Sequence, residues 1–343
     1  MPDPVRDPDR VFMVAELSAN HGGSLAVCLD TVRAAARAGA DAIKVQTYTA
    51  DTITLDSDAD CFRIRDGTLW DGTTLHALYT EAQMPWDWHA PIQAEADRNG
   101  LVFFSSPFDV TAVDYLDALC VPIFKIASFE ILDIPLIEYA AAKGRAMIMS
   151  TGIAGLAEIE EAVAACRRVG NDQITLLTCT SAYPADPGDA NLATLPLLAS
   201  TFGVRVGLSD HTMDDVVAIA AVALGARVVE KHFILDRAMG GPDASFSLEP
   251  DQFAALVANV RTTERAMGRV SWGPTGQAAV NKRFGRSLFI AEDMKAGDIL
   301  TEVNLRSVRP GDGLHPRNWR ALLGRAVTRD VRRGTPMTWS LVD

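Results

Sequence analysis

The chain has 343 residues, of which 48% are hydrophobic and 22% are charged, a globular composition whose length suits one large domain and one small one. The formal net charge of −12 argues against a nucleic-acid partner, which needs clustered Lys and Arg, although a local cationic pocket can still bind a small anion. No apolar run approaches the roughly 20 residues of a membrane-spanning helix, the N-terminus carries no apolar leader, and the five cysteines lack CxxC spacing, so we expect a cytoplasmic protein with free thiols and no membrane partner.

Short apolar runs recur up to Ile234, most of them followed by a stretch with the spaced apolar residues of an amphipathic helix. Several runs are nearly continuous in Val, Ile, Leu or Phe, as in strands that are buried on both faces. Eight β-then-α units over roughly 250 residues predict a (β/α)8 barrel. An open doubly wound sheet is the alternative, but it usually has fewer strands, and no GxGxxG motif follows the first run. The eight predicted strands are Val11–Leu17, Asp41–Tyr48, Leu101–Pro107, Ile123–Glu130, Ala146–Gly152, Ile174–Ser181, Val204–Thr212 and Arg227–Ile234.

Two segments are longer than this repeat requires. Thr49–Pro85 contains the motif DGTLWDG at Asp66–Gly72 and a predicted short helix at Leu75–Ala82. Arg237–Pro250 follows the eighth strand and contains two consecutive glycines. Both segments follow strands, on the face where barrel enzymes place their active sites, so we interpret them as lids or specificity loops.

The character of the sequence changes after residue 268. We assign residues 1–268 to the barrel, 269–285 to a linker of mixed Gly, Pro and polar residues, and 286–343 to a small β-rich module. A module of about 60 residues buries little core by itself, so we expect it to pack against a barrel, either its own or a partner's. Its predicted strands are Ser287–Ala291, Leu305–Val308, Arg325–Val327 and Met337–Leu341.

Two histidines stand near the ends of consecutive predicted strands. His211 lies in Val204–Thr212, within GLSDHT, and His232 lies in Arg227–Ile234, within EKHF. A strand–helix–strand unit lays its strands parallel through a right-handed crossover, and adjacent strand ends lie about 4.8 Å apart. Two imidazoles at that separation can hold one divalent metal, with coordination positions left open for a ligand. The alternative is that both are ordinary polar residues at loop edges.

Charged residues interrupt the apolar strands. A barrel strand has no packing reason to carry Lys or Glu, because an unpaired buried charge costs several kcal/mol. Together these residues predict a polar pocket at one end of the barrel, where coupled charges are candidate functional groups. A structural charge network on the barrel floor is the alternative. The residues are Glu16, Lys44, Lys125, Glu130, Glu230 and Lys231.

The chemistry of these residues implies an anionic substrate. The ammonium groups of Lys44 and Lys125 can bind phosphate or carboxylate oxygens through charge-assisted hydrogen bonds. A metal on the two histidines can polarise a carbonyl as a Lewis acid, and Glu16 and Glu130 can act as acid, base or metal ligand. The set fits the joining of an anionic nucleophile to a metal-bound aldehyde. Hydroxyls that can add hydrogen bonds to the anion belong to Ser105, Ser128, Ser150, Ser181 and Ser209.

These residues lie in motifs that resemble the sialic acid synthase family over almost the full chain. The C-terminal module resembles the antifreeze-like (SAF) domain of that family, and RSVRPGDGLHP is its most similar stretch. GTLWDG and LYTEAQMPWDWH are most similar to the pseudaminic acid synthases of the family. The motifs that carry the resemblance are AELSANHGGS, DAIKVQTYTADTITL, GTLWDG, SSPFD, FKIASFEI, STG, CTSAYP, GLSDHT and EKHFILDRAMGGPDASFSLEP.

The resemblance implies an enzyme that condenses phosphoenolpyruvate with an open-chain, N-acetylated amino sugar to give a nine-carbon 2-keto acid and phosphate. In the pseudaminic branch the sugar is 2,4-diacetamido-2,4,6-trideoxy-L-altrose. The family also implies a divalent metal (Mn²⁺, Mg²⁺ or Co²⁺) on His211 and His232, and a domain-swapped homodimer in which Arg309 contacts an N-acyl group in the partner's sugar site. The implied catalytic residues are Glu16, Glu130, Lys44 and Lys125, and the implied substrate-binding residues are Gln46, Ser128, Ser150, Ser181, Tyr183, Ser209 and Asp210.

Other functions stay open from the sequence. N-acetylneuraminate and legionaminate synthases share the chemistry with a different amino sugar, and neuraminate synthases typically carry Asn where this chain has Ser181. A Schiff-base aldolase that uses Lys125 or Lys44 would leave the two histidines unexplained. A non-catalytic sugar-binding protein would not need two lysines and two glutamates in one pocket.

Overall fold

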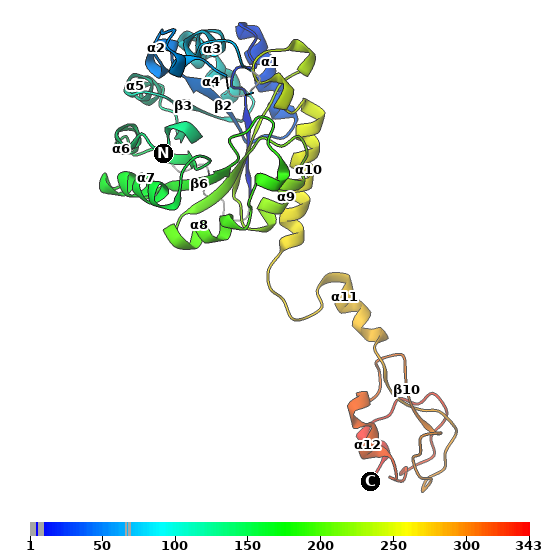
Figure 1. The fold of residues 1–343 in the computed structure, drawn as a ribbon. Helices are drawn as coiled ribbons and strands as arrows, with labels where there is room; N and C mark the ends of the chain where they lie inside the picture. The colour runs from blue at the N-terminus through cyan, green and yellow to red at the C-terminus, as the bar shows by residue number, and fades with distance from the viewer. Residues whose placement is uncertain (1–4, 6–9, 66, 68–69) are drawn as a thin grey trace. The chain divides into compact units, whose positions relative to one another are not determined.

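Eight parallel strands close into a barrel within the first 268 residues, each strand pairing with the next and β8 pairing with β1 (Figure 1). The structure is a computed structural model and describes residues 5, 10–65, 67 and 70–343. The predicted (β/α)8 barrel is confirmed. Each strand lies inside its predicted range and is shorter than it, in most cases because the predicted range includes residues of the loop that follows. The strands are β1 (Phe12–Glu16), β2 (Ala42–Thr47), β3 (Val102–Pro107), β4 (Ile123–Ile126), β5 (Ala146–Ser150), β6 (Ile174–Cys179), β7 (Arg205–Asp210) and β8 (Val228–His232).

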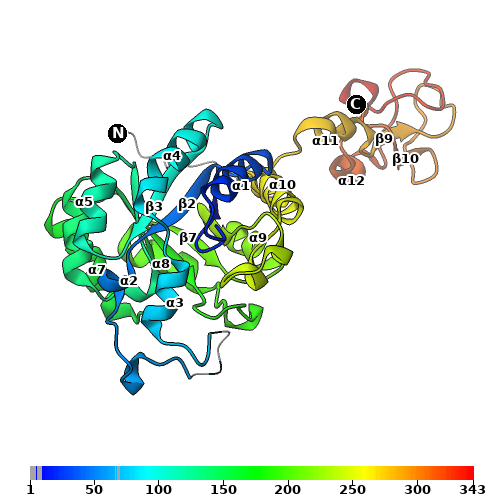
Figure 2. The ribbon, with the colours of Figure 1, turned by 90° about the horizontal axis from the view of Figure 1, so that it is seen from above.

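A layer of helices surrounds the barrel (Figure 2). Capping side chains, proline and glycine determine where several of these helices begin and end. Asp109 accepts hydrogen bonds from two backbone N–H groups at the start of α5, and α10 begins at Pro250, whose fixed φ suits the first helical turn. Gly203 ends α8 with φ 64°, a left-handed conformation that residues with a Cβ rarely adopt. The surrounding helices are α1 (Leu25–Arg37), α4 (His89–Arg98), α5 (Val110–Ala118), α6 (Ile134–Ala142), α7 (Leu156–Arg168), α8 (Thr194–Phe202), α9 (Val216–Ala223) and α10 (Pro250–Met267).

The two long loops follow β2 and β8. The first carries α2 (Ala50–Ile53) and α3 (Leu75–Ala82), so the predicted helix there is confirmed. Its DGTLWDG motif falls partly outside the described residues, at positions 66, 68 and 69. The second loop contains two short 3-10 helices, Arg237–Met239 and Ala244–Phe246. Across the ranges that the structure describes, no helix has both the length and the apolar character needed to cross a membrane.

The side chains that point into the barrel form an apolar layer and a polar layer. Residues two apart on a strand share a face, so Phe12, Val14 and Glu16 of β1 all point inward. The first two belong to the apolar layer, and Glu16, at the end of the strand, belongs to the polar layer. The apolar layer keeps water away from beneath the polar side chains, which are therefore desolvated. The apolar layer comprises Phe12, Val14, Ala42, Phe104, Ile123, Ala146, Ile148, Leu177 and Val228.

The C-terminal unit, Arg269–Asp343, has a small hydrophobic core of its own. In its two-stranded antiparallel sheet, β9 (Ser287–Ile290) pairs with β10 (Leu305–Val308). Both strands lie where the sequence predicts them. The unit also contains α11 (Gly276–Asn281) and α12 (Trp319–Leu322).

Two predicted strands of this unit are wrong. In Arg325–Val327, Ala326 bridges Ile299 while Val327 bridges Val342, so no ladder of consecutive pairs forms. In Met337–Leu341, the last three residues form a 3-10 helix. Both segments are apolar because they contribute to the small core, and a short apolar run cannot distinguish that role from a strand.

Candidate active site

Four charged side chains from four strands meet inside the barrel, and we call Glu16, Lys44, Lys125 and Glu230 the charge cluster. Glu230 Oε1 accepts a hydrogen bond from Lys44 Nζ at 2.9 Å and lies 3.5 Å from Lys125 Nζ. Glu16 Oε2 lies 3.3 Å from Lys44 Nζ. All four side chains are buried. Glu230 therefore stabilises two ammonium groups that the barrel interior would otherwise not tolerate.

Burial and mutual attraction set the charge states of the cluster. Burial raises the pKa of Glu16 to about 7, against the attraction of Lys44. Burial also acts to raise the pKa of Glu230, but the attraction of Lys125 and Lys44 outweighs it and lowers that pKa to about 2. Burial lowers the pKa of Lys125. With Glu16 protonated, the cluster combines one carboxylate with two ammonium groups and carries a net positive charge.

Serine hydroxyls extend the cluster. Ser150 Oγ accepts a hydrogen bond from Lys125 Nζ at 2.8 Å. Ser209 Oγ donates to Glu230 Oε1 at 3.2 Å. Ammonium groups beside hydroxyls form a suitable site for phosphate or carboxylate oxygens. Ser150 and Ser209 therefore both contact the charge cluster.

Ser128 and Ser181 lie in the loops after β4 and β6, and their hydroxyls share a hydrogen bond of 2.8 Å. Ser105 does not join them, because its hydroxyl donates to the Val45 carbonyl oxygen at 3.0 Å on the other face of the sheet. The neighbouring Ser106 has a buried hydroxyl without a hydrogen-bond partner among the described residues. Sequence reasoning missed it, although the alternation along β3 places residue 106 on the inner face.

His211 and His232 lie close together, with ring centroids 5.3 Å apart. His211 Nδ1 lies 2.9 Å from the Thr180 carbonyl oxygen, which can only accept a hydrogen bond, so Nδ1 carries the proton and Nε2 is free. Burial, assisted by His232, lowers the pKa of His211 to about 4. Burial, assisted by Lys44, lowers the pKa of His232 to about 3. Both rings are therefore neutral near pH 7, the form that binds metals.

Sequence reasoning also missed Asp243, a buried residue in the loop after β8. Its Oδ2 accepts a hydrogen bond from the Ala19 N–H at 3.2 Å and lies 3.6 Å from His232 Nδ1. His232 Nδ1 is buried and has no hydrogen-bond partner among the described residues, so Asp243 is the carboxylate next to this ring without being hydrogen-bonded to it. The available signal was the Gly-Gly-Pro-Asp turn at residues 240–243, which holds a carboxylate near the end of the eighth strand.

Lys231 and Asp210 do not join the charge cluster. Each precedes one of the two histidines by a single residue, and alternation turns both side chains to the outer face of the sheet. Lys231 Nζ lies 2.9 Å from Asp210 Oδ2 and donates to the Thr212 carbonyl oxygen at 2.8 Å. Asp210 Oδ1 accepts a hydrogen bond from the Thr212 N–H at 2.9 Å. The pair lies behind the loop of His211, on the face of the sheet away from the charge cluster.

Gln46 and Tyr183 border the cluster and the histidines. Gln46 Nε2 donates to Glu16 Oε1 at 3.2 Å and to Ser18 Oγ at 2.9 Å. The Tyr183 ring lies 4.4 Å from the His211 ring, between centroids. Both predicted residues are therefore within reach of a ligand that contacts the histidines or Glu16.

Glu130 and Arg309 complete the predicted set. Glu130 lies in the 3-10 helix Ser128–Glu130, and its Oε2 is buried without a hydrogen-bond partner in the described chain. Burial raises the pKa of Glu130 to about 7. Arg309 follows β10 in the C-terminal unit and is exposed.

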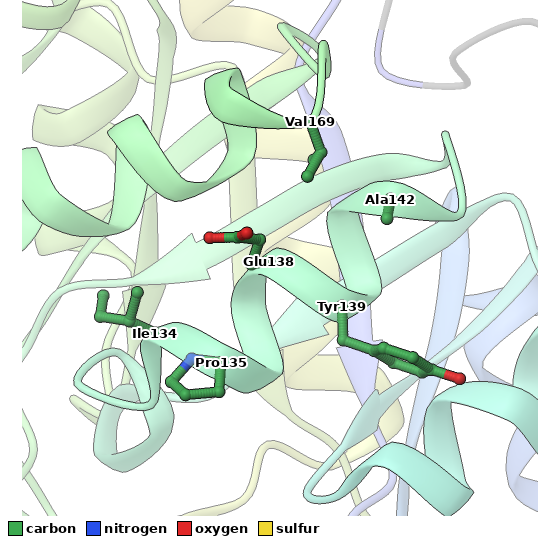
Figure 3. Close-up of a pocket in the computed structure, with 6 residues that line it drawn as sticks. All are labelled: Ile134, Pro135, Glu138, Tyr139, Ala142 and Val169. Carbon is green, nitrogen blue, oxygen red and sulfur yellow. The ribbon is translucent and has the colours of Figure 1, made fainter.

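A separate groove of about 510 Å³ lies along α6 on the helix layer (Figure 3). No member of the charge cluster lines it, and its one charged wall residue, Glu138, is already paired with Arg168 at 2.7 Å. The groove is mainly apolar and offers no buried polar group to a ligand, so we place the active site inside the barrel. The groove is lined by Ile134, Pro135, Glu138, Tyr139, Ala142 and Val169.

Comparison with known proteins links this chain to one family. Residues 31–271 match the NeuB family and residues 285–343 match the SAF domain. The chain is 43% identical over 325 residues to pseudaminic acid synthase of Campylobacter jejuni subsp. jejuni serotype O:23/36 (strain 81-176), covering 95% of this chain and 94% of that protein. It is 42% identical over 327 residues to pseudaminic acid synthase of Helicobacter pylori (strain ATCC 700392 / 26695), covering 95% and 96%. The solved structure of N-acetylneuraminic acid (sialic acid) synthetase from Leptospira borgpetersenii serovar Hardjo-bovis matches with a TM-score of 0.71 at 32% identity, over 78% of this chain and 88% of that one.

The raised pKa of Glu130 predicts a pH-dependent stability. The folded protein holds this proton up to about pH 7, whereas the unfolded chain releases it near pH 4.5. The contribution of Glu130 to the free energy of unfolding is therefore complete below pH 4.5 and is lost as the pH rises through about 7. Glu130→Gln cannot ionise, so we expect it to gain roughly 2–3 kcal/mol relative to wild type between about pH 5 and pH 8.5.

Urea unfolding of the metal-free protein across this pH range measures the effect. Glu161→Gln, at an exposed position on α7, is the matched control and should follow wild type. Parallel stability curves for wild type and Glu130→Gln would contradict the prediction.

Proposed function

The chain belongs to the NeuB family, and from that premise we propose that it condenses phosphoenolpyruvate with an open-chain, N-acetylated amino sugar to give a nine-carbon 2-keto acid and phosphate. The sugar that we propose is 2,4-diacetamido-2,4,6-trideoxy-L-altrose, which makes the product pseudaminic acid. Identity of 42–43% with pseudaminic acid synthases over 95% of the chain supports this sugar. The match to an N-acetylneuraminic acid synthetase, at 32% identity, is weaker.

One observation supports a condensation of phosphoenolpyruvate with a sugar aldehyde: the charge cluster lies next to two neutral imidazoles. Phosphoenolpyruvate brings a phosphate and a carboxylate, and Lys44 and Lys125 offer charge-assisted hydrogen bonds to such oxygens. The serine hydroxyls beside the lysines add further donors. An acidic protein with a net charge of −12 can bind such an anion because the local potential decides binding.

A divalent cation (Mn²⁺, Mg²⁺ or Co²⁺) fits His211 and His232. Both rings are neutral, and the carbonyl behind His211 leaves its Nε2 free for a metal. Within the described ranges, no three His, Cys, Asp or Glu side chains form a group that could hold a metal, so the protein would supply two imidazoles and leave other positions to substrate and water. When bound, such an ion supplies Lewis-acid polarisation of the sugar aldehyde.

The protein's own residues position the reactants and manage protons. Carbon 3 of phosphoenolpyruvate forms the new bond to the aldehyde carbon, water adds at carbon 2, and the bond between carbon 2 and the phosphate oxygen breaks as phosphate leaves. Lys44 and Lys125 bind the anionic groups and fix the enol carbon in place, which supplies proximity and electrostatic stabilisation. Glu16, whose pKa is about 7, holds or releases a proton near neutral pH, as a general acid or base must. Glu130, with a similar pKa, is the second candidate for proton transfer.

We also propose a domain-swapped homodimer in which Arg309 of each C-terminal unit contacts the amino sugar of the other copy. The resemblance of the C-terminal unit to the SAF domain supports this arrangement. An exposed guanidinium offers several hydrogen-bond donors to the carbonyl oxygen of an N-acyl group.

A Schiff-base aldolase is the second candidate. Burial lowers the pKa of Lys125, as it does in lysines that attack carbonyl groups. However, Lys125 Nζ is already held by Ser150 and Glu230, and this reaction leaves the two histidines without a role.

Phosphate release tests the proposal directly. The purified protein should release phosphate from phosphoenolpyruvate only when an amino sugar and a divalent metal are present. Among N-acetylated sugars we expect the 2,4-diacetamido-2,4,6-trideoxy-L-altrose to give a kcat/KM at least about tenfold higher than its stereoisomers. Borohydride trapping with full activity in EDTA would instead establish the aldolase, and a lack of phosphate release with every sugar would reject the reaction class.

The metal assignment predicts the behaviour of two variants. His211→Ala and His232→Ala should each weaken Mn²⁺ binding by about a hundredfold or more, because each removes one of two protein ligands. Electron paramagnetic resonance of free Mn²⁺ measures this binding without turnover. His315→Ala, in the C-terminal unit, is the control. Full metal-dependent phosphate release by either site variant would show that the ligands are wrong.

A further inference from the structure

Gly152 lies in the loop after β5. Glycine is required there because neighbouring atoms leave no room for a side chain, and not because of the backbone conformation. Its φ lies outside the left-handed region that favours this residue. A Cβ at this position would lie 2.3 Å from Ser181 Oγ, 2.7 Å from Ser128 Oγ and 2.9 Å from the Cys179 carbonyl oxygen. Non-bonded heavy atoms prefer separations near 3.5–4.0 Å. Any residue with a side chain would therefore displace both hydroxyls.

The crowding follows from the order of the strands. β5 lies between β4 and β6, so the loops that carry Ser128 and Ser181 begin two strand spacings apart, which is about 10 Å. Serine side chains can meet across that distance only if the loops bring them over the end of β5. Here they do so, and their hydroxyls hydrogen-bond at 2.8 Å over Gly152.

The paired hydroxyls belong to the same end of the site as Lys125. Ser150, two residues before Gly152, accepts a hydrogen bond from Lys125 Nζ at 2.8 Å. Within the pair of serines, one hydroxyl donates to the other, and the second keeps its proton for a ligand oxygen. An anion that binds Lys125 therefore finds a further donor in this pair.

We propose that Gly152 is a positioning residue of the anion site. By lacking a side chain it allows Ser128 and Ser181 to act as one donor set for the phosphate or carboxylate of phosphoenolpyruvate. Gly152 acts through the two serines and is thus a positioning residue. The inference rests on the proposed function, because phosphoenolpyruvate is the substrate of that reaction.

Gly152→Ala tests the role, with Gly155→Ala as the matched control. Gly155 precedes α7 with φ −81°, and a Cβ there would meet only Glu158 Oε2, at 3.6 Å. Gly152→Ala should raise the KM for phosphoenolpyruvate, and the Kd measured by calorimetry, by about tenfold to a hundredfold. The KM for the amino sugar should stay close to wild type. Gly155→Ala should leave both constants unchanged.

A double-mutant cycle separates this role from a general structural one. In a Ser128→Ala/Ser181→Ala background the two hydroxyls are absent, so adding Gly152→Ala should change the Kd for phosphoenolpyruvate much less than it does in wild type. Equal changes in the two backgrounds would overturn the inference, as would wild-type affinity in folded Gly152→Ala. If Gly152→Ala alone does not fold, folding should return in the double-serine background, and continued misfolding there would also overturn it.

Failure of the proposed function is distinguishable from failure of this inference. In the first case the wild-type protein neither binds phosphoenolpyruvate nor releases phosphate from it. In the second case the wild-type protein does both, and Gly152→Ala does so equally well.

Discussion

The carboxylate of Glu230 lies between two buried ammonium groups, and the rest of the site depends on this interaction. An unpaired ammonium group inside the barrel costs several kcal/mol, so neither Lys44 nor Lys125 would remain charged there alone. Glu230 stabilises both and stays ionised, with its pKa lowered to about 2 by the two lysines. One carboxylate does not neutralise two ammonium groups, and the second carboxyl, Glu16, is protonated below about pH 7. The charge cluster therefore has a net positive charge that can attract an anionic ligand.

Alternation along β7 and β8 separates the reactive side chains from those that support them. Glu230 faces the barrel interior, whereas Lys231 faces the helix layer and pairs with Asp210 at 2.9 Å. That buried pair holds the strand ends from which His211 and His232 extend. Replacing one partner of such a pair is costly, because it leaves an uncompensated buried charge. The geometry of the two imidazoles is thus maintained by charges on the outer face of the sheet.

The barrel and its charged interior could be predicted from sequence because they rest on regular β–α units and on period-two alternation. The errors concern the side of the sheet and the shape of loops. The charge of Lys231 and the hydroxyl of Ser105 suggest pocket residues, but each lies on the outer face of the sheet, one residue from an inward position. Asp243 and Gly152 depend on how loops fold back over strand ends, and no sequence period encodes that. Two short apolar segments of the C-terminal unit resemble strands in sequence because their apolar residues contribute to the small core.

The central claim is that the lysines bridged by Glu230 form the anion site, and direct binding of phosphoenolpyruvate tests it most simply. Calorimetry with Mn²⁺-loaded protein, without amino sugar, compares wild type with Lys125→Met, which keeps an unbranched side chain as far as Cε and removes the ammonium group. We expect the Kd for phosphoenolpyruvate to rise about a hundredfold or more while Mn²⁺ affinity is retained, because a buried charge-assisted contact is lost. Wild-type affinity for phosphoenolpyruvate in a folded Lys125→Met protein would contradict the claim.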